Sequence, residues 1–123
     1  MILVDTSIWI EHLRRGDERL TRRLELGQVL GHAYVIGELA LGNLRNRQPI
    51  IGALQDLPQA AVATDEEVLR FVEQNALYGA GIGYIDAHLL AAVRLSPGTT
   101  LWTGDRKLLA AGKRLNLTEN RLQ

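Results

Sequence analysis

The sequence predicts an α/β protein with a mainly parallel sheet that helices cover on both faces. Short apolar segments alternate with segments whose apolar residues recur at helical spacing, and this alternation is typical of parallel α/β folds. The chain has 123 residues, enough for one domain with a substantial core. No repeat, linker or low-complexity segment divides it, so we expect a single domain over residues 1–123.

The N-terminal half begins with an apolar strand at residues 1–5. Thr6 or Ser7 is a suitable N-cap for the helix that follows to residue 15. Asp17 begins a second helix, which we expect to run to about Leu26. The further elements expected in this half are a strand at 28–33, a helix at 34–44 and a short helix at 49–57 with Pro49 in its first turn.

The C-terminal half continues the alternation. Thr64 and Glu67 have the spacing of a capping box, which predicts a helix to about Tyr78. Pro97 and Gly98 end a later apolar helix. The further elements expected in this half are strands at 59–63 and 99–103, helices at 84–95 and 105–115, and an edge strand at 116–118.

Composition excludes several classes of protein. The chain has 14 basic and 14 acidic residues, which argues against a protein that coats nucleic acid non-specifically. It has no cysteine, which excludes disulfides and thiolate metal sites and suits a reducing compartment. No segment approaches the ~18 apolar residues of a membrane span, and the N-terminus does not resemble a signal peptide. We therefore expect a cytoplasmic protein without a membrane partner.

Two aspartates follow predicted strands. Asp5 ends the first strand, and Asp105 follows the strand at 99–103. Open parallel sheets place their ligand sites beyond the carboxyl ends of the strands, so both aspartates lie where chemistry is expected. Aspartate is also a favoured N-cap residue, and each position suits that structural role as well.

Glu38 and Asp86 are harder to explain as structural residues. Both lie within apolar helical stretches, "YVIGELAL" and "GIGYIDAHLLAAV". An unpaired carboxylate on a core helix costs several kcal/mol, which a cation shared by several carboxylates would offset. Ligand sets made only of oxygen suit Mg²⁺ or Mn²⁺. The other acids are explained by helix starts, a turn or nearby arginines.

Such a cation would activate a water molecule and neutralise charge on a phosphodiester. Thr6, Ser7 and Thr103 are placed to hydrogen-bond the carboxylates or a bound water. No cysteine or nucleophile-elbow motif supports covalent catalysis. The three histidines, His12, His32 and His88, lack metal-ligand spacing and are expected to be structural or surface residues, with His32 only weakly a candidate near the site.

Four segments together resemble the PIN domain, and most closely the VapC-type toxins of bacterial toxin–antitoxin pairs. They are "ILVDTSIWIEHL", "VIGELALG", "GYIDAHLLAAV" and "LWTGDRKL", and the likeness extends from residue 1 to about residue 117. The resemblance implies a three-layer α/β/α sandwich and a Mg²⁺- or Mn²⁺-dependent endoribonuclease with one or two ions. By motif, the residues that match the family's acidic quartet are Asp5, Glu38, Asp86 and Asp105, and Thr103 matches an accompanying hydroxyl position.

The resemblance also implies partners. Toxins of this type cut RNA, either tRNA or a ribosomal RNA loop, and so inhibit translation and growth. They usually form homodimers and are neutralised by a VapB-like antitoxin that enters the acidic site. Among the basic residues, the candidates for contact with RNA or antitoxin are Arg14, Arg15, Arg45 and Arg47.

Three alternatives compete with this assignment. A non-catalytic interaction module with the same fold would bind metal without cutting RNA. A phosphoacceptor receiver domain is disfavoured because Asp5 is followed by Thr6 and Ser7 rather than by a second acid. A nucleotide-binding loop at "GAGIGYID" is disfavoured because these glycines follow a predicted helix rather than a strand.

Overall fold

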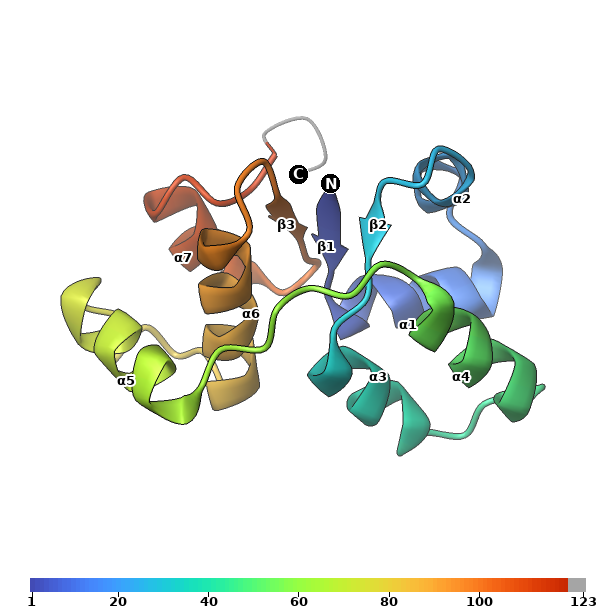
Figure 1. The fold of residues 1–123 in the computed structure, drawn as a ribbon, viewed down its shortest axis with the longest axis horizontal. Helices are drawn as coiled ribbons and strands as arrows, with labels where there is room; N and C mark the ends of the chain where they lie inside the picture. Colours follow the sequence, from blue (N-terminus) through green and yellow to red (C-terminus); the bar gives the residue numbers. More distant parts are fainter. Residues whose placement is uncertain (120–123) are drawn as a thin grey trace.

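The computed structural model describes residues 1–119 and confirms an α/β fold. Short strands alternate with helices along the chain (Figure 1). The elements of these residues are β1 (Ile2–Val4), α1 (Thr6–Arg15), α2 (Glu18–Glu25), β2 (Val29–Leu30), α3 (Ala33–Ala40), α4 (Arg47–Asp56), α5 (Asp65–Gln74), α6 (Tyr84–Leu95), β3 (Thr100–Trp102) and α7 (Arg106–Arg114).

The three strands form a parallel sheet in the order β2-β1-β3. Leu3 at the centre pairs with Leu30 on one side and with Leu101 on the other. All three residues of β1 have no exposed surface. A parallel strand that is covered on both faces has no polar face, which explains why β1 is continuously apolar rather than alternating.

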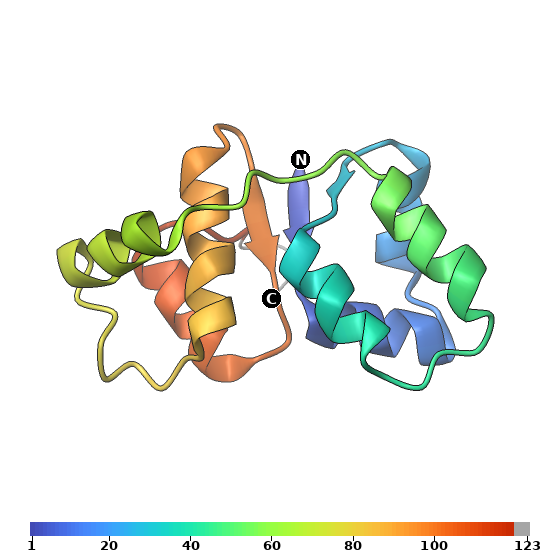
Figure 2. The same ribbon diagram turned by 60° about the horizontal axis from the view of Figure 1, so that its bottom comes forward.

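Helices flank the sheet on both sides (Figures 1 and 2). In both views α5, α6 and α7 lie beyond β3, while α1 to α4 lie beyond β2 and the lower end of β1. Helix α6 packs against β3 and α5, and α3 packs against α1 and α4. The two tryptophans, Trp9 and Trp102, are buried in the core that these layers share. No helix within residues 1–119 is both long enough and apolar enough to cross a bilayer.

The structure confirms the helix starts predicted at Thr64 and Asp17. At α5, Thr64 Oγ1 accepts from the Glu67 amide at 3.1 Å and Glu67 Oε1 accepts from the Thr64 amide at 2.8 Å, so the capping box is complete. At α2, Asp17 accepts from the amides of Arg19 and Leu20. Both helices therefore begin where the side chains satisfy otherwise free amides.

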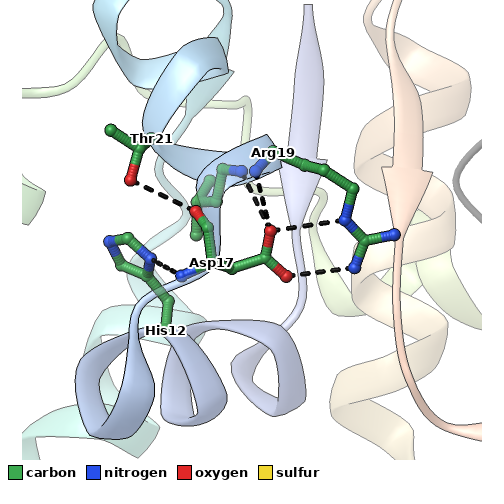
Figure 3. Close-up of polar contacts among 5 residues, drawn as sticks. His12, Asp17, Arg19 and Thr21 are labelled. Atoms are coloured by element: carbon green, nitrogen blue, oxygen red, sulfur yellow. Dashed lines mark hydrogen bonds and ion pairs between the residues drawn. The ribbon is translucent and has the colours of Figure 1, made fainter.

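Asp17 also connects α2 to its neighbours (Figure 3). Its amide donates to His12 Nδ1 at 3.0 Å, and its carboxylate binds the Arg19 guanidinium with an Nη2–Oδ2 distance of 3.0 Å. The Arg19 guanidinium holds the pKa of the Asp17 carboxyl below its usual range. The guanidinium carbon lies 5.0 Å from the ring centroid of Trp102, so this pair lies over β3.

The predicted strand at 59–63 is wrong. Gln59 makes one isolated bridge with Gly31, and the chain then crosses from α4 to α5 without pairing (Figure 2). Strand β2 has only two residues, so it is too short to form a ladder with residues 59–63. Ala60 and Ala63 are buried, which produces the apolar pattern of a strand without its ladder.

Other boundaries also differ from the predictions. Asp5, rather than Thr6 or Ser7, occupies the N-cap position of α1, and its side chain makes no capping hydrogen bond. Helix α3 ends at Ala40 instead of residue 44. Helix α5 ends at Gln74 instead of Tyr78. Asn75 Nδ2 donates a hydrogen bond to the Phe71 carbonyl, and Ala76 adopts a left-handed conformation with a φ of 49°, which ends the helix. The expected strands at 28–33 and 116–118 are reduced to β2 and to a single bridge at Thr118.

Candidate metal centre

The carboxyl ends of the three strands lie at one edge of the sheet, since all strands are parallel. Asp5 follows β1 at this edge, and its amide extends the ladder to the Trp102 carbonyl at 2.9 Å. Its side chain is buried, with 6% of the residue exposed. Asp5 Oδ2 accepts from Ser7 Oγ at 2.8 Å and from Thr103 Oγ1 at 2.7 Å. These two hydroxyl groups supply the hydrogen bonds that a buried carboxylate requires.

The same hydroxyl groups connect two separate turns. Thr103 Oγ1 accepts from the Asp105 amide at 3.0 Å, and Ser7 Oγ accepts from the Gly104 amide at 3.0 Å. The segment after β3 is therefore held against the start of α1 by side chains that also bind Asp5. The contacts expected of Ser7 and Thr103 with a candidate carboxylate are present, and their role in catalysis stays a prediction.

Asp105 has the structural role that the sequence left open. It is the N-cap of α7, where Oδ1 accepts from the amides of Lys107 at 2.9 Å and Leu108 at 3.0 Å. The residue is exposed at the same edge as Asp5. Capping occupies only Oδ1, so the cap and a ligand role for Oδ2 are compatible.

Asp86 is the third residue of α6 and is partly buried. Its Oδ2 accepts from the Gly83 amide at 3.0 Å. Burial raises the pKa of the Asp86 carboxyl, the Gly83 hydrogen bond opposes this, and the charges of the other three candidate acids raise it further. Those three are Asp5, Asp105 and Glu38. Asp86 therefore lies within the electrostatic field of the whole predicted quartet.

Glu38 differs from its prediction in one respect. It lies on α3 as expected, but its side chain is exposed rather than surrounded by core residues. The buried positions of α3 are Val35 and Leu39, and Glu38 lies on the exposed surface of the helix beside them. Its Oε1 accepts from Thr6 Oγ1 at 2.6 Å. The Glu38 carboxylate is solvated, so it does not need a cation to offset burial, contrary to the prediction.

The donor set suits a hard divalent cation. Four carboxylates from four segments raise the negative charge at one edge, and oxygen is the ligand that Mg²⁺ and Mn²⁺ prefer. Within residues 1–119 each of these carboxylates has one oxygen that accepts no hydrogen bond. In the same residues, however, no three Asp, Glu or His side chains converge closely enough to hold an ion. The four carboxylates are therefore suitable ligands for such a cation, but their side chains must move closer together to bind one.

A cavity of about 750 Å³ adjoins the quartet at Glu38. Its walls come from α1, α3 and the segment leading into α4, and they combine apolar side chains with three of the four predicted contact arginines, Arg14, Arg15 and Arg45. Arg47 does not line the cavity, and its Nη1 lies 3.4 Å from the Gly42 carbonyl. The structure thus brings three of these arginines together beside Glu38.

Sequence reasoning missed a polar group on the other flank. Tyr84 donates its hydroxyl to Asp65 Oδ1 at 2.7 Å, and His88 Nε2 lies 3.3 Å from the same oxygen. The hydrogen bond to Asp65 raises the pKa of Tyr84 to about 12 and lowers that of Asp65. Tyr84 and His88 are spaced by one helical turn, which the sequence shows, but Asp65 belongs to α5 and only the fold brings it to them.

The comparisons with known proteins agree with this architecture. Residues 2–114 match the PIN domain. The chain is 49% identical over 111 residues to "Ribonuclease VapC32" of Mycobacterium tuberculosis, in both the CDC 1551 / Oshkosh and H37Rv strains, and the match covers 90% of this chain and 90% of each relative. With this match and a parallel sheet whose carboxyl edge carries the acids, the chain belongs to the PIN-domain family and, within it, to the VapC type.

Proposed function

We propose that this protein is a VapC-type endoribonuclease that depends on Mg²⁺ or Mn²⁺ and acts as the toxin of a toxin–antitoxin pair. The observation that carries the proposal is the 49% identity over 90% of the chain to a protein named as a VapC ribonuclease. The acids at the carboxyl edge of the sheet supply a chemical reason for such an activity. The proposed ligands are Asp5, Glu38, Asp86 and Asp105, holding one or two ions.

The residues of the chain would divide the work as follows. A bound ion would activate a water molecule and neutralise charge on the scissile phosphodiester. Ser7 and Thr103 hold Asp5 through its Oδ2, and Oδ1, which accepts no hydrogen bond within residues 1–119, would be available to an ion. Thr6 restrains Glu38 in the same way at Oε1. Such outer hydrogen bonds orient metal ligands and commonly change metal affinity by about 10- to 100-fold when removed.

The direct test is cleavage of total cellular RNA by the purified protein with Mg²⁺ or Mn²⁺, with every new end mapped. We expect discrete cuts, in tRNA or ribosomal RNA, that disappear with EDTA and with Asp86→Asn. The matched control is Asp56→Asn, an exposed acid at the end of α4 away from the quartet. If wild-type protein with saturating metal cuts nothing, the non-catalytic module becomes the better assignment.

Metal binding can be tested without RNA. Saturating Mn²⁺ binds only the folded protein and should therefore raise the melting temperature. Asp86→Asn should abolish most of this rise, whereas Asp56→Asn should keep it. An equal rise in all three proteins would place the Mn²⁺ site outside the quartet.

The cavity beside Glu38 is the surface we propose for contact with RNA or antitoxin. Its apolar walls suit burial of side chains, and Arg14, Arg15 and Arg45 suit phosphates or acidic side chains. Reversal of charge in Arg14→Glu should weaken binding of both single-stranded RNA and a co-expressed VapB-like antitoxin. Arg70→Glu, on α5 and outside the cavity, is the control and should change neither.

We also propose that residues 1–123 act as one domain and that the protein forms a homodimer. Light scattering on the purified chain tests the dimer, which should give twice the mass of 13.6 kDa. Limited proteolysis tests the domain, since a single cooperative unit should yield no stable fragment smaller than the PIN match.

A further inference from the structure

A row of four aromatic rings crosses from the end of β2 to the start of α6. His32 and Tyr34 have ring centroids 5.4 Å apart, Tyr34 and His88 4.7 Å, and Tyr84 and His88 4.8 Å. All three contacts are edge-to-face, with interplanar angles between 67° and 87°. Edge-to-face geometry is the arrangement that neighbouring aromatic rings prefer. None of these rings belongs to the proposed metal ligands.

Hydrogen bonds fix both ends of this row. At one end, the Tyr34 amide donates to His32 Nδ1 at 3.0 Å, so the proton of the neutral His32 ring is on Nε2. At the other end, Asp65 Oδ1 accepts from the Tyr84 hydroxyl at 2.7 Å and lies 3.3 Å from His88 Nε2. Both histidines have no exposed surface.

The second nitrogen of each buried histidine ring has no partner. His32 Nε2 and His88 Nδ1 are buried, and neither has a hydrogen-bond partner within residues 1–119. Burying two unpaired polar atoms costs free energy, and packing alone does not require polar rings at these positions. A role beyond simple packing would explain it.

The row joins two groups of helices that lie on different sides of the sheet. Helix α3 packs against α1 and α4, whereas α6 packs against α5 and β3. In Figure 2, α3 lies with α1 and α4 on one side of the sheet and α6 lies with α5 and α7 on the other. The contact between Tyr34 of α3 and His88 of α6 spans this division.

We propose that the row of His32, Tyr34, His88 and Tyr84 is a positioning device that sets the separation of α3 and α6. Glu38 lies one turn beyond Tyr34 on α3, and Asp86 lies between Tyr84 and His88 on α6. Holding Tyr34 against His88 therefore fixes how far apart these two candidate ligands can lie. Only this last step rests on the proposed function, because the separation of the helices is independent of metal.

The separation can be measured without metal. The chain has no cysteine, so two introduced cysteines can carry spin labels without background. Leu41→Cys and Leu95→Cys suit this purpose, since Leu41 is 91% and Leu95 48% exposed at the ends of α3 and α6. Electron–electron distance measurement in EDTA should give a narrow distribution in the otherwise wild-type protein. Tyr34→Leu should broaden or shift it.

The control must lose stability without touching the row. Phe71→Leu is suitable because Phe71 is a buried aromatic residue of α5 that packs beneath Arg94 of α6. We expect it to lower the melting temperature while leaving the distance distribution unchanged. Tyr34→Phe is the conservative variant, since the Tyr34 hydroxyl donates no hydrogen bond within residues 1–119, and it should restore the wild-type distribution.

A second measurement connects the row to the metal. Tyr34→Leu should weaken Mn²⁺ binding about tenfold, as for other groups that act through a ligand, whereas Tyr34→Phe and Phe71→Leu should bind as wild type does. An unchanged distance distribution in Tyr34→Leu, or an equal change in Phe71→Leu, overturns the inference whatever the metal does. If the wild-type protein binds no Mn²⁺, only the proposed metal site is overturned. The distances between the spin labels still decide whether the row sets the separation of α3 and α6. If Tyr34→Leu does not fold, Tyr34→Met, which also removes the ring that contacts His88, takes its place.

Discussion

Thr6 Oγ1 donates a hydrogen bond of 2.6 Å to Glu38 Oε1 and so joins the first turn of α1 to α3. The two residues are 32 positions apart in sequence, and both lie outside the core. This contact is the only hydrogen bond that restrains the Glu38 carboxylate within residues 1–119.

Removing this contact should affect activity more than stability. Thr6→Val keeps the shape of the side chain and loses the donor, so Glu38 samples more rotamers. Because the pair is exposed, we expect a loss of at most ~1 kcal/mol in the free energy of unfolding, with Mn²⁺ affinity and RNA cleavage reduced about tenfold. The control is Thr21→Val, which removes an exposed hydroxyl that donates to the Asp17 carbonyl at 3.2 Å. It should leave Mn²⁺ affinity and RNA cleavage unchanged.

Asp105 allows capping to be separated from charge. Asp105→Asn keeps an acceptor for the amides of Lys107 and Leu108, and Asn and Asp are about equal as N-caps. Its stability in urea should therefore match wild type, while Mn²⁺ affinity falls. Asp105→Ala should lose the cap as well, at a cost of ~1 kcal/mol. If Asp105→Asn binds Mn²⁺ as tightly as wild type does, Asp105 is only the N-cap of α7 and not a metal ligand.

Thr103 should be important for stability because Asp5 is buried. Thr103→Val removes a donor to Asp5 Oδ2 and an acceptor for the Asp105 amide. Buried groups left without partners cost about 1–3 kcal/mol, and urea unfolding should show a loss of this size. Thr103→Ser should recover most of it. As a comparison, Thr99→Val removes a hydroxyl that makes no hydrogen bond within residues 1–119 and should be nearly neutral.

His32 should make the stability depend on pH. Burial, reinforced by the charge of His88, lowers the pKa of His32 from 6.5 to about 4. Between these values the unfolded chain binds more protons than the folded one, so this contribution is complete above pH 6.5 and is lost as pH falls toward 4. The full change is roughly 3 kcal/mol.

Unfolding in urea at several pH values tests this expectation. His32→Asn removes the titration and offers an oxygen in place of Nδ1 to accept from the Tyr34 amide. The variant should lose less stability than wild type between pH 7 and pH 5. Parallel pH profiles for the two proteins would mean that other groups cause the dependence.

Much of the fold could be predicted because its signals are local. The capping box of Thr64 and Glu67, the N-cap at Asp17 and the apolar helix at 84–95 depend on residues within one or two turns of each other. The strand at 59–63 could not be separated from an extended crossover, because burial of Ala60 and Ala63 gives the same pattern in both. Pairing depends on the partner edge, and β2 is too short to provide one.

The candidate site divides in the same way. By itself, the sequence determined the four acids, their motifs and the positions of Asp5 and Asp105 after strands, since alternation places the carboxyl ends of parallel strands together. Only the tertiary structure decided that Glu38 is exposed, that Asp105 also caps α7, and that Tyr34, His88 and Asp65 meet from three helices. The physical reason is distance along the chain. Hydrophobic periodicity and helix capping depend on residues that are close in sequence. The exposure of a side chain and the contacts between rings depend on how helices that are remote in sequence pack together.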